Sequence, residues 1–150
     1  ESILVEMSVV NTNHPVVNAV LNQKFHLARE QGTSMIFKVG DMSGIRLNEE
    51  ETVILLSNLL DNAIHECLKV VKAGRKAVIH IKLVQEGGKI ILSVKNPVLE
   101  KVQITDGIVL DSNGGMHGIG LSNVKTVVDK YGGDFVISCD SEKFQAVVML

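Results

Sequence analysis

The longest regular pattern of apolar and polar positions runs from Asn48 to Lys72. At 100° per residue, one broad side of this segment is apolar and carries Leu56, Leu59, Leu60, Ala63, Ile64, Cys67, Val70 and Val71. A polar stripe lies opposite and consists of Asn58, Asn62, His65 and Lys69. Asn48 can cap the start, and Glu51 can complete a capping box. The pattern predicts a long helix with one face in the core.

Two other segments show helical spacing of their apolar residues. They are Asn18–Gln31 and Gly118–Tyr131, and glycine follows each of them. Glycine just past a helical pattern is a common stop signal, because it adopts the left-handed backbone conformation easily. The sequence therefore predicts three helices.

Five short runs are rich in strand-forming residues: Met35–Val39, Lys76–Val84, Lys89–Val94, Asp134–Ser138 and Phe144–Leu150. Short glycine-containing or polar loops connect the second run to the third and the fourth to the fifth, which predicts two hairpins. Asn96-Pro97 is expected to end the third strand, because proline cannot continue a central ladder.

The stretch from Asn96 to Met116 has few periodic features and several glycines. An irregular segment of this length in a compact domain is more often a functional lid or a mobile loop than a mistaken assignment of secondary structure.

Together these elements predict an α+β fold. The expected architecture is a two-layer sandwich, with helices on one face of a mixed, mostly antiparallel sheet. A chain of 150 residues with 45% hydrophobic residues is most simply one folded domain.

Composition excludes several classes of function. The net charge of −2 and the aromatic content of 3% argue against a nucleic-acid surface, which needs excess Lys and Arg and often aromatic stacking. Cys67 and Cys139 lack metal-ligand spacing, so they are expected to be reduced, buried thiols. No apolar run approaches the roughly 20 residues that span a bilayer, so we expect no membrane contact by this part of the protein.

Glycines gather just before the last predicted helix, in His117-Gly118-Ile119-Gly120-Leu121. Glycine lets the backbone approach a ligand, and the free amides at a helix start bind anions such as phosphate. Alone this signal is weak, and an ordinary flexible loop explains it equally well.

The polar stripe of the long helix adds a second signal. The amide oxygen of Asn62 is a hard ligand that suits Mg²⁺, and His65, one turn later, can donate to a phosphate. Each of these residues can instead be a polar side chain that faces water.

Two segments resemble motifs of one family. Residues 57–66, SNLLDNAIHE, are similar to the N box of the Bergerat-fold (GHKL) ATPase superfamily, and residues 117–133, HGIGLSNVKTVVDKYGG, are similar to its glycine box as found in sensor histidine kinases. The order of N box, strand pair, lid, glycine box and final hairpin also matches. The resemblance covers nearly the whole chain and is closest to peptide-pheromone receptor kinases of Gram-positive bacteria.

The resemblance implies roles for individual residues. Asn62 matches the magnesium-binding asparagine, and His65 stands where a basic side chain often contacts phosphate. Gly118 and Gly120 match the phosphate-cradling glycines, and their neighbours His117, Ile119 and Leu121 are expected at the nucleotide as well.

Asn96 departs from the family pattern. It stands where most members have an aspartate that reads the adenine amino group. An amide oxygen can still accept this hydrogen bond, but without the assistance of a negative charge, so adenine binding is expected to be weaker.

Asn58 bears on the reaction. Hydrolytic members of the superfamily have a glutamate at this position, one turn before the magnesium asparagine, as general base for a water molecule. Asn58 cannot accept a proton, which favours phosphoryl transfer over hydrolysis.

The resemblance implies that the chain binds Mg²⁺-ATP and donates the γ-phosphoryl group to a histidine on a separate dimerisation domain, as part of a two-component system with a response regulator. Residues 1–14 would then be a linker remnant and residues 15–150 the catalytic domain, a cytoplasmic part of a membrane-anchored parent. His14 lacks an acidic neighbour and is a poor candidate for the acceptor.

Two alternatives remain open. The degenerate adenine box is compatible with a non-catalytic interaction module that has lost its nucleotide. A serine kinase of a partner protein would use the same pocket.

Overall fold

The computed structural model describes residues 10–100, 103–105, 108–110 and 119–150. Its elements are, in chain order, α2 (Pro15–Glu30), β1 (Ser34–Val39), α3 (Glu49–Lys72), β2 (Val78–Glu86), β3 (Lys89–Pro97), β4 (Gln103–Thr105), β5 (Ile108–Leu110), α4 (Ile119–Lys130), β6 (Asp134–Cys139) and β7 (Lys143–Met149).

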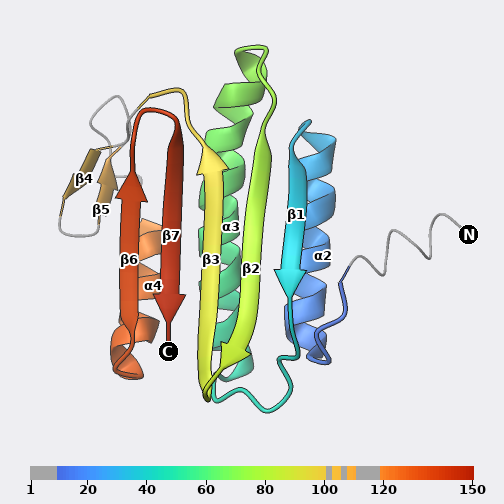
Figure 1. Cartoon of the computed structure of the whole chain (residues 1–150), viewed down its shortest axis with the longest axis vertical. Helices are drawn as coiled ribbons and strands as arrows, with labels where there is room; N and C mark the ends of the chain where they lie inside the picture. The colour runs from blue at the N-terminus through green and yellow to red at the C-terminus, as the bar shows by residue number, and fades with distance from the viewer. Residues whose placement is uncertain (1–9, 101–102, 106–107, 111–118) are drawn as a thin grey trace, which may run out of the picture.

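Five strands form one sheet in the order β1-β2-β3-β7-β6. The β1–β2 pair is parallel and the other three pairs are antiparallel. Helices α2, α3 and α4 lie together behind the sheet in Figure 1, so one face is covered and the other faces the viewer. This arrangement confirms the predicted α+β sandwich. None of the described helices is long and apolar enough to cross a membrane.

Helix α3 begins as its sequence predicts. The Asn48 side chain accepts a hydrogen bond from the Glu51 amide at 2.7 Å, and Glu51 accepts one from the Asn48 amide at 3.0 Å. The apolar side of α3 packs on the sheet, where Leu59 and Leu60 are buried.

Helix α2 begins at Pro15, which suits the first turn of a helix, three residues before the apolar helical pattern starts at Asn18. His14 caps it, because its Nδ1 accepts a hydrogen bond from the Val17 amide at 3.2 Å. Lys24 of α2 forms an ion pair with Asp61 of α3 at 2.8 Å, which joins the two helices on their outer side.

Strand β3 ends at Pro97, within the Asn96-Pro97 pair predicted to end it, but it extends three residues beyond Val94, the last residue of the predicted run. The strand includes Asn96 and Pro97, which pair with β7 in the register Asn96↔Phe144 and Pro97↔Lys143. The amide of Val98 donates to the Glu142 carbonyl at 3.0 Å, so the Pro97 nitrogen points to the other side, toward β2. Pairing with β2 already ends at Lys95, and proline removes no ladder bond there. Strand β2 itself is displaced by two residues from the predicted range.

The stretch expected to be irregular contains the hairpin β4–β5, a separate two-stranded sheet. Each of these strands has three residues, too few for an alternating pattern to be recognised. Residues 96–100 of this stretch are also described, whereas residues 101–102, 106–107 and 111–116 lie outside the described residues. The ranges of β1, α4, β6 and β7 agree with the prediction within one residue.

The cysteines follow the prediction in part. Both are free thiols, and Cys67 is buried. Its burial raises the pKa of the thiol to about 12, so Cys67 stays protonated at neutral pH. Cys139, in contrast, is only half-buried.

Candidate functional site

The polar stripe of α3 lies at the flank of the core rather than opposite it. Asn58, Asn62 and Lys69 are half-buried, whereas His65 is exposed. Helix α4 packs against α3 on this side. The residues predicted from the N box therefore face the boundary between α3 and the segment that carries the glycine box.

Asn58 meets the first turn of α4. A Cβ atom added at Gly120 would lie 2.7 Å from the Oδ1 atom of Asn58, which is closer than such atoms can approach. The Nδ2 atom of Asn58 donates to the Ile54 carbonyl at 2.8 Å, so its amide is held in place. The two motifs thus meet, and helix packing favours glycine at position 120.

Asn62 follows Asn58 by one turn on the same side of α3. No group of three or more His, Cys, Asp or Glu residues that could hold a metal ion occurs among the described residues. A single amide oxygen fits a Mg²⁺ ion only when waters and phosphate oxygens complete the shell, which is how this ion is commonly bound.

Asn96 is one of three described residues with a buried side-chain oxygen atom that lacks a hydrogen-bond partner, and the other two are Asn22 and Thr33. Asn96 is 1% exposed and follows Ile90, Leu92 and Val94 on the helix-covered side of β3. Its Nδ2 atom donates to the Pro97 carbonyl at 2.9 Å, which leaves Oδ1 as the acceptor atom of the amide. Oδ1 is buried and has no hydrogen-bond partner among the described residues. Leaving a buried acceptor unpaired costs about 1–3 kcal/mol, so this atom fits a ligand that donates a hydrogen bond.

Asn96 lies level with the polar stripe of α3. Ile90 and Leu92 line a cavity together with Leu55 and Leu56, and β3 and α3 run in the same direction (Figure 1). From Leu92 to Asn96 the strand advances about 13 Å, and α3 needs roughly nine residues for that distance. The buried acceptor therefore lies near the turns of α3 that contain Asn62 and His65.

The glycine box is described only in part. His117 and Gly118 lie outside the described residues, and α4 begins at Ile119. Gly120 is half-buried beside Asn58, and the Leu121 side chain is buried in the core with 2% exposure. For Leu121, only the main chain remains available to a ligand.

Sequence reasoning missed Glu66. This carboxylate is buried, with 6% exposure, and forms an ion pair with Lys69 at 3.0 Å. It follows Asn62 by four residues and so continues the row of Asn58 and Asn62 along the helix. The four-residue spacing from Asn62 is visible in the sequence and would have been enough to place Glu66 in this row.

A second polar cluster joins the opposite end of the two helices. Glu51 of α3 accepts hydrogen bonds from Lys130 and Tyr131 at the end of α4. The guanidinium of Arg46 lies 5.2 Å from the centre of the Tyr131 ring. The Lys130 ammonium and the Tyr131 hydroxyl lower the pKa of the Glu51 carboxyl to about 2. Glu51 therefore stays charged over the physiological pH range.

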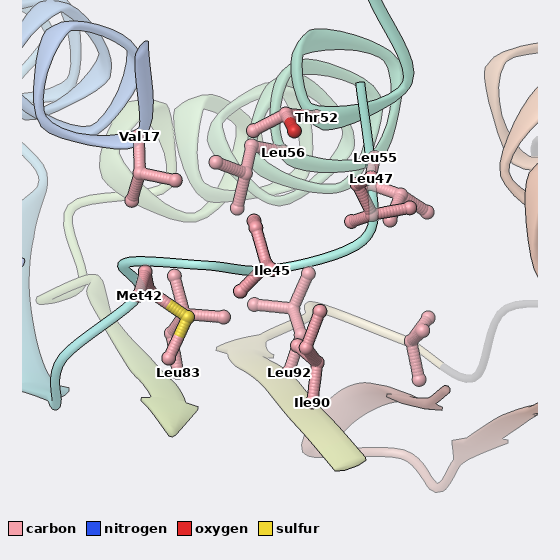
Figure 2. Close-up of a pocket in the computed structure, with 11 residues that line it drawn as sticks. Val17, Met42, Ile45, Leu47, Thr52, Leu55, Leu56, Leu83, Ile90 and Leu92 are labelled. Atoms are coloured by element: carbon pink, nitrogen blue, oxygen red, sulfur yellow. The ribbon is translucent and has the colours of Figure 1, made fainter. Parts of the chain in front are cut away.

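An apolar cavity of about 20 Å³ lies near that end of α3 (Figure 2). Val17, Met42, Ile45 and other aliphatic side chains line it, and Thr52 is its one polar residue. The Thr52 hydroxyl already donates to the Asn48 carbonyl at 2.8 Å. Since Thr52 precedes Asn62 by about 15 Å along the helix, this cavity is separate from the polar site.

The five-stranded mixed sheet with three helices on one face defines the class of two-layer α+β sandwich domains to which this chain belongs. Residues 47–150 match the GHKL domain family, and the chain belongs to this family.

Solved structures of histidine kinases share the fold. The catalytic domain of the histidine kinase ThkA in a nucleotide-free form is 18% identical, with a TM-score of 0.67 and coverage of 93% of both chains. A blue-light-activated histidine kinase domain from Erythrobacter litoralis is 12% identical, with a TM-score of 0.61, and the match covers 89% of this chain and 58% of the other.

Full-length ShkA, solved in complex with AMPPNP, is 16% identical, with a TM-score of 0.66. This match covers 90% of the chain and 29% of ShkA. No curated protein matches the chain in sequence.

Proposed function

We propose that this chain binds Mg²⁺-ATP and donates its γ-phosphoryl group to a histidine on a separate dimerisation domain. The observation that carries the proposal is the buried, unpaired Oδ1 atom of Asn96, next to the amide stripe of α3. An adenine amino group is a donor of the kind that this atom lacks.

The residues predicted from the two motifs and from Asn96 would divide the ligand between them. Asn96 would accept from the adenine, and Asn62 would hold the metal ion. His65, with the main chain from Gly118 to Leu121 and the side chain of His117, would contact the phosphates. Bound ATP supplies the phosphoryl group, and Mg²⁺ neutralises its charge.

Asn58 supports transfer rather than hydrolysis. Its Nδ2 atom is committed to the Ile54 carbonyl, and an amide has no basic electron pair with which to take a proton from water. In the absence of an acceptor domain, the γ-phosphoryl group should therefore remain on the nucleotide.

The wider setting is part of the same proposal. Residues 1–14 would link the catalytic domain, residues 15–150, to an upstream phosphoacceptor domain. The parent would be a membrane-anchored receptor kinase of the Gram-positive peptide-pheromone type, with its catalytic part in the cytoplasm and a response regulator downstream. The sequence features that resemble this subgroup support this setting.

Calorimetric titration of ATP, with and without Mg²⁺, tests the site. We expect Asn62→Ala to remove the magnesium dependence and Asn96→Val to abolish detectable binding. Asn22→Ala is a matched control, because Asn22 is a half-buried amide on α2 whose Nδ2 atom also bonds a carbonyl four residues earlier. No binding of ATP to any of the four proteins, each shown to be folded, would favour the interaction module, whereas equal affinity of all four would place the nucleotide at another site.

A second assay addresses the acceptor. The chain and [γ-³²P]ATP are incubated with a dimerisation domain that contains a phosphoacceptor histidine. Phosphohistidine is acid-labile and stable to alkali, whereas phosphoserine is stable to acid. Acid-stable label on the acceptor would favour the serine kinase.

A further inference from the structure

The face of the sheet that points away from the helices carries a second set of chemically related side chains. No described helix covers this face, which Figure 1 turns toward the viewer. Because strand side chains alternate, every second residue of each strand points outward. On β3 these are the odd-numbered positions, since the even-numbered positions from Ile90 to Asn96 are buried.

The outward positions are strongly basic. They include Lys38 on β1, His80 and Lys82 on β2, Lys89 and Lys95 on β3, and Lys143 on β7. Only two acidic residues, Glu86 and Asp134, occupy outward positions of these strands. The chain as a whole has a net charge of −2, so positive charge is concentrated here.

The register places like charges side by side. Lys38 pairs with Lys82, and His80 pairs with Lys95. Within the described part of the chain, none of these four residues forms an ion pair with an acidic side chain. Like charges directly opposite each other destabilise a sheet. The stability of the isolated domain therefore does not explain why basic residues lie opposite each other on this face.

A groove of about 320 Å³ opens at the basic end of this face. Val78 and Pro97 contribute apolar surface, and Lys76, His80, Lys95 and Lys143 surround them together with Glu142. The groove lies on the reverse side of β3 from Asn96, because neighbouring strand residues point to opposite faces.

An apolar strip adjoins the basic region. Ile91 pairs with both Val84 and Met149, and Val147 pairs with Val136, so the five side chains form two adjacent rows. Val136 is 58% exposed and Met149 is 38% exposed. Contiguous exposed apolar side chains beside charged ones are typical of protein interaction surfaces.

We propose that the outer face of the sheet is a docking surface for an acidic protein partner. Carboxylates of the partner would lie over the groove, between Lys95 and Lys143, and its apolar side chains would cover the strip from Val84 to Val136. Charge complementarity assigns this occupant, because three lysines and a histidine line the groove together with a single glutamate.

Two other occupants fit less well. A second copy of the chain, joined by a two-fold axis through the groove, would place these lysines against their own copies. Nucleic acid would find no aromatic side chain at the outward positions, because Phe37, Phe135 and Phe144 lie on the other side of their strands.

A pair of synthetic peptides tests the proposal. The probe is a fluorescently labelled peptide of glutamate, leucine and alanine, and its match has glutamine in place of every glutamate. Fluorescence anisotropy with the whole chain should show binding of the acidic peptide alone, and this binding should weaken as salt is added. Lys95→Glu combined with Lys143→Glu should lower the affinity by about tenfold.

The matched control is Lys72→Glu, an exposed charge reversal in the last turn of α3, away from the sheet. It should change the affinity less than about twofold. Val136→Thr keeps the shape of the strip and should weaken binding by about threefold, which separates docking from simple attraction between opposite charges.

Three results would overturn the proposal: no binding of the acidic peptide, an equal loss in Lys72→Glu, or tighter binding of a single-stranded oligonucleotide. Circular dichroism and ATP titration of the double variant show whether its fold and its separate nucleotide site are intact.

Discussion

The two ends of the α3–α4 pair are built from different chemistry. At one end, Glu51 joins the first turn of α3 to the last residues of α4 through two hydrogen bonds, one of them also an ion pair. At the other end, about 10 Å away along α3 and about 15 Å away along α4, Asn58 touches Gly120, and the acceptor of Asn96 has no partner among the described residues.

The difference separates stability from function. Every oxygen of Glu51 has a partner, so this end holds the helices together without a ligand. The end with Asn96 keeps a buried polar atom unsatisfied, which lowers the stability of the empty protein and leaves binding energy for a donor. Three experiments test this division, from the largest expected effect to the smallest.

The largest effect is expected at Gly133, just beyond the anchored end of α4. A Cβ atom there would lie 2.3 Å from the Met149 carbonyl oxygen, and the backbone of β7 cannot move aside easily. Gly133→Ala should lower the free energy of unfolding by about 3 kcal/mol, measured by urea denaturation. Gly132→Asn is the control and should lose less than about 1 kcal/mol, because asparagine tolerates the positive φ of 65° at this position.

Glu51→Gln tests the anchor directly. The pKa of Glu51 falls from an ordinary 4.5 to about 2 in the folded chain, so the ionised group stabilises the fold above about pH 4.5, and this contribution is lost as the pH falls toward 2. The variant should have a lower Tm than the original protein at pH 7, and the difference should shrink through this pH window. A difference in Tm that stays constant from pH 7 to pH 2 would show that the ion pair is not the cause.

The smallest effect is expected at Gly120, on the ligand side. Gly120→Ala should destabilise the fold by about 1 kcal/mol through the contact with Asn58. In an Asn58→Ala background the obstacle is gone, and the same change should stabilise the fold by about 0.5 kcal/mol, because alanine favours a helix more than glycine does. A double-mutant cycle in urea measures this reversal, and additive effects would contradict the contact.

Local patterns predicted the fold well. The start of α3 depends on Asn48 and Glu51, three residues apart, and its apolar side depends on spacing within one helix. Both signals are contained in a short window of sequence. The predicted run of β3 stops at Val94, three residues before the strand ends. Whether a proline fits into a strand depends on which side of that strand has a hydrogen-bonded neighbour. That information comes from pairing with β2 and β7.

The site was predicted less completely for a similar reason. Asn58, Asn62 and Asn96 could be proposed from motifs, and their roles remain predictions. The pairing of Glu51 with Lys130 and Tyr131 links residues about 80 positions apart, and no local pattern indicates it. The contact of Gly120 with Asn58 is equally non-local, so the reason for a glycine there became visible only in the packed structure.

The position of β7 in the sheet also has a consequence for synthesis of the chain on the ribosome. Strand β3 lies between β2 and β7, and its partner in β7 is made about 50 residues later. Until then, the nascent chain presents the free edge of β3, which other strands can pair with. Asn96 lies on that edge, so the part of the site proposed to bind adenine can form only after β7 has left the exit tunnel. A nascent chain that stalls before this point would expose the unpaired edge of β3, and the proposed nucleotide pocket would be incomplete.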